Sequence, residues 1–175
     1  VETLRANGFV ASRLDEGVFK TVDIHESLDT VLLFLHHKMK ERIQVEKHYG
    51  PHATLYCTGE LNQVLMNLVA NAVDAIEGEG KITLTTGQRE GISFISVQDS
   101  GKGIPAAIQE KIFEPFFTTK PVGQGTGLGL SIAHSIVQAH QGRIRVHSEE
   151  GRGTEMVIEI PLDLEVRTGA PVASN

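Results

Sequence analysis

The sequence predicts an α+β fold in which a mixed, largely antiparallel sheet of about five strands is covered on one face by about three helices. Apolar residues recur at helical spacing in three separate segments. Between these segments, short β runs come in pairs and do not alternate strictly with helices. The length of 175 residues allows one domain with a sizeable core and is too short for two domains of ordinary size.

The first half of the chain supplies two of the expected helices. They run from about His25 to Lys40 and from Glu60 to about Glu77, each with an apolar stripe. Between them, Arg42 to His48 and Ala53 to Cys57 alternate apolar and polar residues on either side of Gly50-Pro51. We expect these two segments to pair as a hairpin.

The second half supplies two further hairpins and one long irregular stretch. Lys81 to Gly87 pairs with Ile92 to Gln98, and Arg143 to Ser148 pairs with Thr154 to Ile160. Asp99 to Thr126 shows no regular pattern beyond a short helix expected after Pro105. So long a loop in a compact domain is usually functional or mobile.

Composition narrows the function classes and the expected domain organisation. A net charge of -6 argues against a nucleic-acid partner, and the single cysteine fits a reducing compartment. No apolar run approaches the roughly 18 residues of a membrane span. We therefore expect a cytoplasmic fragment without direct membrane contact, and the prediction leaves open a membrane anchor in its parent. The expected divisions are residues 1–17 as an extension, 18–162 as the domain and 163–175 as a tail.

A glycine-rich stretch, GQGTGLGLSIAHSIVQAHQG from Gly123 to Gly142, leads directly into the third expected helix. Such a loop lets backbone N–H groups approach an anion, and the positive end of a helix dipole favours negative charge. The alternative is a flexible surface loop before an ordinary amphipathic helix. The chain contains neither a P-loop nor a dinucleotide-binding glycine pattern, so those two phosphate sites are excluded.

Two other groups of polar residues are candidates for a site. Asn67, Asn71 and Asp74 fall at i, i+4 and i+7 of one helix, which aligns them in a column that could serve a hard cation or simply face water. Asp99 ends a strand and is followed by Ser-Gly-Lys-Gly. Its carboxylate could accept hydrogen bonds from a planar amine, or the segment could be an ordinary turn.

Four segments together resemble the N, G1, F and G2 boxes of the histidine kinase ATP-binding domain. They are LNQVLMNLVANAVDAI (61–76), DSGKGIP (99–105), IFEPFFTTK (112–120) and GTGLGLSIAHSIVQAHQG (125–142). The boxes occur in the family's order and at its spacing, and the resemblance covers about Asp23 to Leu162. It implies the two-layer α/β sandwich shared by gyrase, heat-shock chaperones, mismatch-repair ATPases and these kinases, with a long ATP lid over Pro105 to Gly125.

The resemblance also implies a role for individual residues. Asn71 would bind Mg²⁺ that bridges the ATP phosphates, with support from Asn67, and Lys120 would complete the catalytic set. Phe116 and Phe117 would pack the lid. The adenine site would consist of Ala75, Asp99, Gly101, Gly103, Ile104 and Thr154. The phosphate site would consist of Thr119, Lys120, Gly125, Thr126, Gly127, Leu128, Gly129 and Leu130.

The same resemblance implies phosphoryl transfer to another protein segment. Hydrolytic members of the superfamily carry a glutamate four residues before the metal-binding asparagine; Asn67 occupies that position here, and an amide is not a general base. We expect ATP to phosphorylate a histidine in a separate dimerisation domain, and a response regulator to act through the full-length protein. Residues 1–17 resemble the tail of the second dimerisation helix. His25 is not the expected acceptor, and His140 is expected to be structural.

The expected fragment is a monomer from a homodimeric parent, it binds ATP or ADP, and it does not phosphorylate itself. Two alternatives remain open at this point. One is a protein serine kinase of the anti-sigma type, which shares the nucleotide-binding fold. The other is a non-catalytic nucleotide sensor whose lid changes its contacts with partners.

Overall fold

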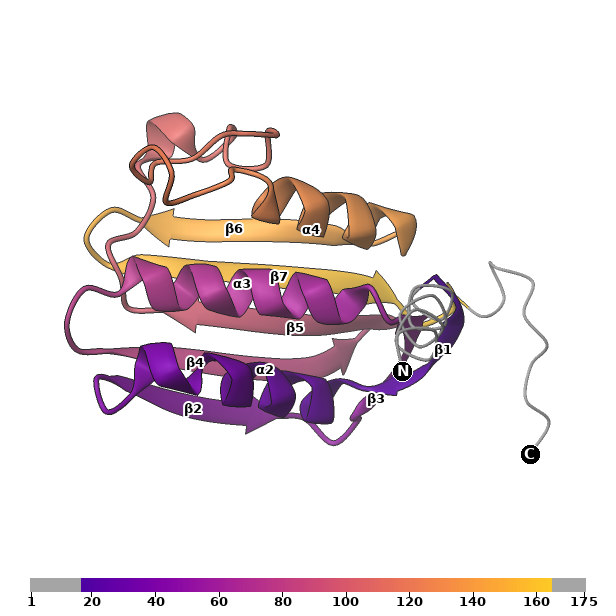
Figure 1. Cartoon of the computed structure of the whole chain (residues 1–175). Coiled ribbons are helices and arrows are strands. Elements are labelled where there is room, and N and C mark those ends of the chain that lie inside the picture. The colour runs from indigo at the N-terminus through magenta and orange to yellow at the C-terminus, as the bar shows by residue number, and fades with distance from the viewer. Residues whose placement is uncertain (1–16, 165–175) are drawn as a thin grey trace, which may run out of the picture.

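A five-stranded sheet with the order β2-β4-β5-β7-β6 forms one layer of the molecule, and three helices form the other. Figure 1 shows α2, α3 and α4 side by side on one face of this sheet. The computed structural model describes residues 17–164. The two-layer sandwich with three helices and a mixed five-stranded sheet is therefore confirmed. The expected extension and tail, residues 1–17 and 163–175, lie outside the described residues except for their innermost positions.

The elements follow the predicted order, with ends that differ by a few residues from those expected. They are β1 (Phe19–Asp23), α2 (Ile24–Met39), β2 (Ile43–Tyr49), β3 (Thr54–Thr58), α3 (Leu61–Ala75), β4 (Gly80–Arg89), β5 (Ile92–Asp99), the 3₁₀ turn η1 (Ala106–Ile108), α4 (Gly129–Ala139), β6 (Arg143–Glu149) and β7 (Gly153–Pro161). The β4–β5 and β6–β7 pairs are antiparallel, as predicted.

The predicted hairpin between the first two helices is wrong. β2 pairs in parallel with β4, and β3 pairs antiparallel with β1 in a separate two-stranded sheet. The ladder between β2 and β4 extends beyond Tyr49, because the Gly50 N–H donates to the Thr86 carbonyl oxygen at 3.0 Å. Gly50-Pro51 is typical of a turn, but it is not one of the two-residue sequences that join the strands of a β-hairpin. Burial then decides the pairing, since Leu55 and Cys57 of β3 are buried in the core.

The core lies between the two layers and is built from the predicted apolar stripes. Asp23 caps α2, since its side chain accepts a hydrogen bond from the Glu26 N–H at 3.0 Å. The buried face of α3 contains Leu61, Val64, Leu65, Leu68, Val69, Ala72 and Val73. Burying such faces against the sheet is the main favourable term in folding. Among residues 17–164, no helix combines the length and the apolar character that crossing a membrane would require.

His140 joins the small sheet to the third helix. Its Nε2 atom accepts from the Thr58 N–H of β3 at 3.0 Å, and its Nδ1 atom lies 2.7 Å from the Ile136 carbonyl oxygen of α4. The side chain is 1 % exposed, and its ring packs against Phe19 of β1. The structural role expected for this histidine is confirmed.

Replacing His140 by leucine is expected to lower the free energy of unfolding by about 1–3 kcal/mol, because the buried Thr58 N–H would lose its acceptor. Urea denaturation followed by circular dichroism measures this. His147→Leu is the matched control because His147 is exposed. Equal stabilities of the two variants would contradict the structural role.

Candidate functional site

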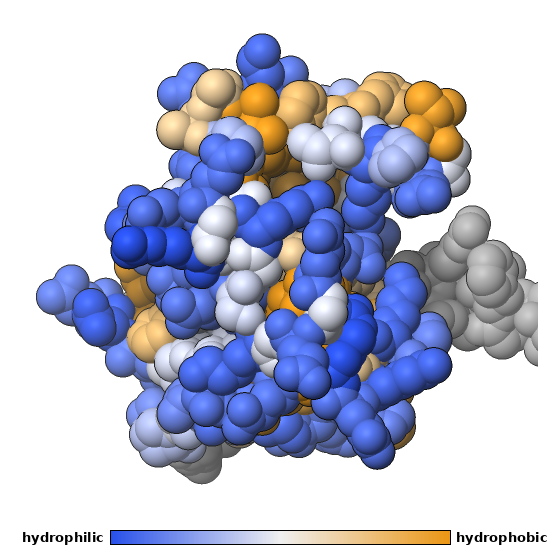
Figure 2. Space-filling view, turned by 90° about the vertical axis from the view of Figure 1, so that its left-hand side faces the viewer, coloured by the Kyte–Doolittle hydropathy of each residue, from blue (hydrophilic) through white to orange (hydrophobic). Residues whose placement is uncertain are grey.

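A cavity of about 460 Å³ opens at one end of the sandwich. Its walls come from α3, from the ends of β5 and β7, from the long segment 105–125 that we call the lid, and from the start of α4. Figure 2 looks onto this end of the molecule, with the lid forming the upper part. Apolar side chains gather along that upper part and the surface below is largely polar, and Phe116 and Val122 of the lid are exposed.

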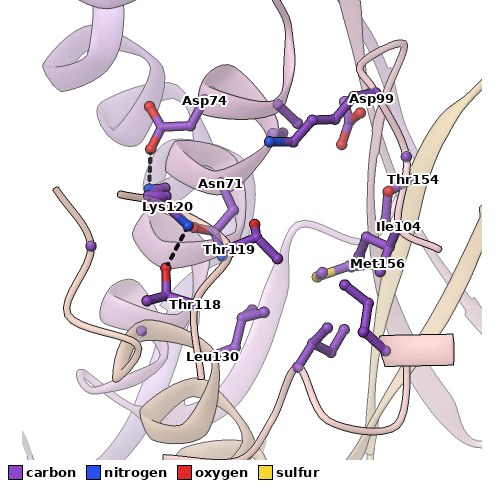
Figure 3. A pocket seen from close by; sticks show the side chains of 18 of the residues that line it. Asn71, Asp74, Asp99, Ile104, Thr118, Thr119, Lys120, Leu130, Thr154 and Met156 are labelled. Atoms are coloured by element: carbon purple, nitrogen blue, oxygen red, sulfur yellow. Dashed lines mark hydrogen bonds and ion pairs between the residues drawn. The ribbon is translucent and has the colours of Figure 1, made fainter. Parts of the chain in front are cut away.

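The floor of the cavity is made by two cross-strand pairs of β5 and β7. Asp99 is paired with Thr154, and Val97 with Met156. All four line the cavity, because residues two apart on a strand point to the same face. Figure 3 shows Thr154, Met156 and Ile104 together on one side, with Asn71 and Lys120 opposite. One end of the cavity is therefore largely apolar, with the Asp99 carboxylate as its fixed acceptor.

The Asp99 carboxylate is held in a buried position. The side chain is 7 % exposed, and its Oδ1 atom accepts from the Gly101 N–H at 2.8 Å. Burial raises the pKa of Asp99, whereas hydrogen bonds from the backbone of Gly101 and Thr154 oppose this rise. Gly101 lies against the Ala75 carbonyl of α3, where a side chain would collide. This contact brings the loop after β5 close to the helix and fixes the carboxylate.

The Thr154 hydroxyl belongs to a short chain of hydrogen bonds. Ser148 of β6 accepts from the Ile104 N–H at 2.8 Å and donates to the Gly153 carbonyl at 3.0 Å. Thr154 Oγ1 lies 2.7 Å from the same Ser148 oxygen and therefore donates to it. The lone pairs of the Thr154 hydroxyl are then available to accept a hydrogen bond from a water or a ligand in the cavity.

The polar residues Asn67, Asn71 and Asp74 of α3 have two different roles. Asn71 and Asp74 line the cavity, whereas Asn67 lies one turn before Asn71 and outside the lining. The Asn67 amide donates to the Gly129 carbonyl oxygen at 2.9 Å. Asn67 thus holds the first turn of α4 against α3.

One ion pair holds the lid against α3, and a second hydrogen bond lies within the lid itself. Lys120 Nζ lies 2.6 Å from Asp74 Oδ2, and the Lys120 N–H donates to Thr118 Oγ1 at 3.1 Å; Figure 3 draws both. Further along, the Phe116 N–H donates to the Gly127 carbonyl at 2.8 Å. Gly127 has φ +67° and lies so close to the Phe116 backbone that a side chain would collide with it. This glycine is therefore required where the segment leading into α4 packs against the lid.

The first turn of α4 faces the cavity through Gly129 and Leu130. Leu128 immediately precedes this helix, and its side chain makes no capping hydrogen bond. A helix start offers unpaired N–H groups and the positive end of a dipole, so this turn suits an anion. Of the two possibilities for the glycine-rich stretch, this geometry favours the anion site.

The structure gathers most of the expected site residues around the cavity. Those that line it are Asn71, Ala75, Asp99, Gly103, Ile104, Thr119, Lys120, Gly125, Thr126, Gly127, Gly129, Leu130 and Thr154. Asn67, Gly101 and Leu128 do not line it. They adjoin residues that do, so their contribution is to position those residues.

The sequence reasoning missed several lining residues, among them Val97, Asp74, Met156, Lys102 and Glu150. The period of two along a strand could have found Val97 from Asp99 and Met156 from Thr154. Asp74 stood in the polar column without an assigned role. No pattern in the sequence marks the other two, because the loop packing decides which of these exposed residues turn toward the cavity.

The donor set of the cavity fits a magnesium–nucleotide complex better than a free metal ion. Residues 17–164 contain no group of three or more His, Cys, Asp and Glu side chains that could hold a metal. Mg²⁺ keeps several waters and commonly binds one or two protein oxygens together with substrate phosphates. The Asn71 side chain lines the cavity and carries one oxygen of the kind that such a complex requires.

Comparison with known proteins places the cavity within a matched domain. Residues 58–164, more than half of the chain, match the family described as histidine kinase-, DNA gyrase B- and HSP90-like ATPase. The chain is 47 % identical over 104 residues to the signal transduction histidine-protein kinase AtoS of Escherichia coli strain K12, a match that covers 59 % of the chain. It spans only 17 % of the length of AtoS.

Solved structures show the same relationship. The catalytic domain of histidine kinase ThkA superposes with a TM-score of 0.75 at 35 % identity, covering 83 % of this chain and 96 % of that domain. ThkA in complex with the response regulator TrrA superposes with a TM-score of 0.71 at 29 % identity, covering 94 % of this chain and 49 % of that one.

Asp99→Asn is expected to raise the melting temperature at pH 7. Burial raises the pKa of this carboxyl in the folded chain, so above that pKa the folded state holds a buried charge that the unfolded state solvates. As the pH falls through the folded pKa, the folded chain takes up the proton and the penalty disappears. The gain in melting temperature should therefore shrink between neutral pH and about pH 4.

Asp29→Asn provides the control of opposite sign. The hydrogen bond from Lys47 lowers the pKa of Asp29, so its charged form stabilises the fold at neutral pH and that contribution is lost as the pH falls. Melting curves between pH 4 and 8 compare the two variants. The account fails if Asp99→Asn melts at or below the wild-type temperature at pH 7.

Proposed function

Because this chain belongs to the histidine kinase-, DNA gyrase B- and HSP90-like ATPase family, as the ATP-binding catalytic domain of a histidine kinase, we propose that its cavity binds ATP with Mg²⁺ and directs the γ-phosphoryl group to a histidine of a separate dimerisation domain. The observation that carries the proposal is the convergence of four distant segments on one cavity. These segments are α3, the loop after β5, the lid with the start of α4, and β7.

We assign the base to the end of the cavity that contains Asp99. An ionised carboxylate only accepts hydrogen bonds, so it suits the amino group of adenine and disfavours a carbonyl oxygen at the same place. Val97, Met156 and Ile104 supply apolar surface for a planar ring beside it. Thr154 contributes a hydroxyl oxygen that accepts a hydrogen bond from the adenine amino group or from a bridging water, and Ala75, Gly101 and Gly103 form the border.

We assign the triphosphate to the opposite end, between α3 and the start of α4. Asn71 would hold Mg²⁺, which neutralises phosphate charge when it is bound. The backbone N–H groups from Gly125 to Leu130 would hydrogen-bond the phosphate oxygens, and Thr119 and Lys120 would reach them from the lid. Preorganised donors of this kind supply most of what phosphoryl transfer requires from a protein.

Transfer to an external nucleophile agrees with the role of Asn67. The position available to a general base holds an amide whose N–H is already bonded to the Gly129 carbonyl. Asn67 thus supports the phosphate site by holding α4 and does not activate a water. In the proposed step, an imidazole nitrogen of the acceptor histidine forms the new N–P bond, the bond between the γ-phosphorus and the bridging oxygen breaks, and ADP leaves.

The acceptor and the downstream partner lie in the rest of the parent protein. We propose a cytoplasmic catalytic domain at residues 18–162 that works with a histidine-containing dimerisation domain in a homodimer. ThkA forms a complex with the response regulator TrrA, and this supports a response regulator as the downstream partner here. The domain alone would then be a monomer that binds nucleotide without phosphorylating itself.

Calorimetric titration tests nucleotide binding. The wild-type chain should bind ATP saturably in the presence of Mg²⁺. Asp99→Asn should weaken binding of both ATP and adenosine by about 10- to 100-fold, because a hydrogen bond to a charged group is lost. Asn71→Ala should weaken ATP in the presence of Mg²⁺ and leave adenosine unchanged. Absence of saturable binding by the wild-type chain would refute the proposal.

A second experiment tests the transfer. With γ-labelled ATP and Mg²⁺, the chain alone should stay unlabelled, whereas adding the dimerisation domain of its parent should give a phosphoprotein that loses its label in acid. An acid-stable label would indicate the serine kinase alternative, since phosphoserine survives acid. Nucleotide binding with no transfer to the supplied domain would indicate the sensor alternative.

A further inference from the structure

An ion pair links the lid to the wall of the cavity near the assigned phosphate site. Lys120 Nζ lies 2.6 Å from Asp74 Oδ2, and the two residues are 46 positions apart in the sequence. Both side chains line the cavity. Figure 3 shows the Lys120 amine meeting the Asp74 carboxylate beside Asn71. A lid cation is therefore bound to a protein carboxylate at the place where a terminal phosphate is expected.

Asp74 is the carboxylate that pairs with this lysine, although the two residues are far apart in the sequence. It follows Asn71 by three residues on α3, so the two side chains lie on the same face of the helix. A second cation, Lys38 of α2, lies 3.9 Å from the other carboxylate oxygen. If Lys120 leaves, Asp74 retains this neighbouring charge and is not left isolated.

We propose that Asp74 is a positioning residue that holds Lys120 when the site contains no nucleotide and releases it to the terminal phosphate of ATP. This inference rests on the proposed function and adds that the Asp74 carboxylate competes with the ATP phosphates for Lys120. The Asp74–Lys120 pair acts as an exchangeable latch, in which one oxyanion partner of the lysine is replaced by another. Lid closure and triphosphate binding are coupled because they use the same ammonium group.

The charges and the exposure make such an exchange favourable. The side chains of Lys120 and Asp74 are 38 % and 32 % exposed, and exposed ion pairs contribute little to stability. A triphosphate brings several negative charges to a site where the carboxylate brings one. The carboxylate also repels the incoming phosphates across the short distance between α3 and the start of α4. Removing its charge without changing its shape should therefore assist the triphosphate.

Asp74→Asn is expected to tighten ATP binding by about three- to tenfold while adenosine binding stays unchanged. Without nucleotide, hydrogen exchange of the lid amides should become faster, because the latch is lost. Asp74→Glu keeps the charge and should restore both properties toward the wild type. Calorimetry with ATP and adenosine, together with hydrogen exchange measured by mass spectrometry over residues 110–128, gives these values.

A double-mutant comparison separates the latch from a general structural effect. Lys120→Met should weaken ATP binding more strongly in the Asp74→Asn background than in the wild-type background, because the lysine is then bound only to phosphate. Asp29→Asn is the matched control: it removes an aspartate that is also paired with a lysine, at 2.8 Å, on the outer face of α2. It should leave ATP affinity and lid exchange unchanged.

The results distinguish this inference from the function on which it rests. If the wild-type chain fails to bind ATP, the proposed function itself fails. If the wild-type chain binds ATP and Asp74→Asn binds it equally or more weakly, the latch is refuted, and weaker binding would make Asp74 a direct aid to the metal–phosphate complex. Equal effects of Lys120→Met in both backgrounds would also overturn it.

Discussion

The hydrogen bond from the Asn67 amide to the Gly129 carbonyl is the contact on which the site depends. It joins the middle of α3 to the first turn of α4 over a distance of 2.9 Å. Because α4 begins shortly after the lid ends, this bond anchors the C-terminal side of a segment that is otherwise held by few contacts. The cavity exists because the lid leaves the body at β5 and is returned to α3 at this point. An amide suits this position because it donates to a carbonyl without introducing a charge beside the proposed phosphate site.

The opposite end of the cavity shows that function and stability make different demands. Asp99 is buried and its pKa is raised, so the fold would be more stable without its charge. The loop after β5 and the β6–β7 turn hold the carboxylate through backbone contacts, with the Gly151 N–H donating to the Lys102 carbonyl at 2.6 Å. A rigid frame of this kind keeps a costly acceptor in place, and a preorganised acceptor is what the proposed selectivity for an amino group requires.

The sequence correctly predicted the features that depend on local residue patterns. It did not predict the pairings that depend on contacts between distant segments. Apolar periodicity placed α3 and its buried face, and strand alternation placed β4 with β5. The pairing of β2 was predicted wrongly, because the choice between β3 and β4 as partners depends on burial across the whole sheet. The site residues came from ordered motifs, so their gathering around one cavity could be anticipated. The pairing of Asp74 with Lys120 could not, since it joins positions 46 apart through the path of the lid.

Different physical constraints explain why glycine occupies individual positions in the stretch that leads into α4. Gly127 has a positive φ and touches the Phe116 backbone, so its lack of a side chain lets the segment before α4 pack against the lid. Gly129 is already helical, and a methyl group there would approach no atom of Asn67 closer than 3.8 Å. A glycine-rich sequence thus combines a folding requirement with open access for an anion to the helix start. The lid can be ordered on its inner side and still leave the N–H groups of α4 free to meet a phosphate.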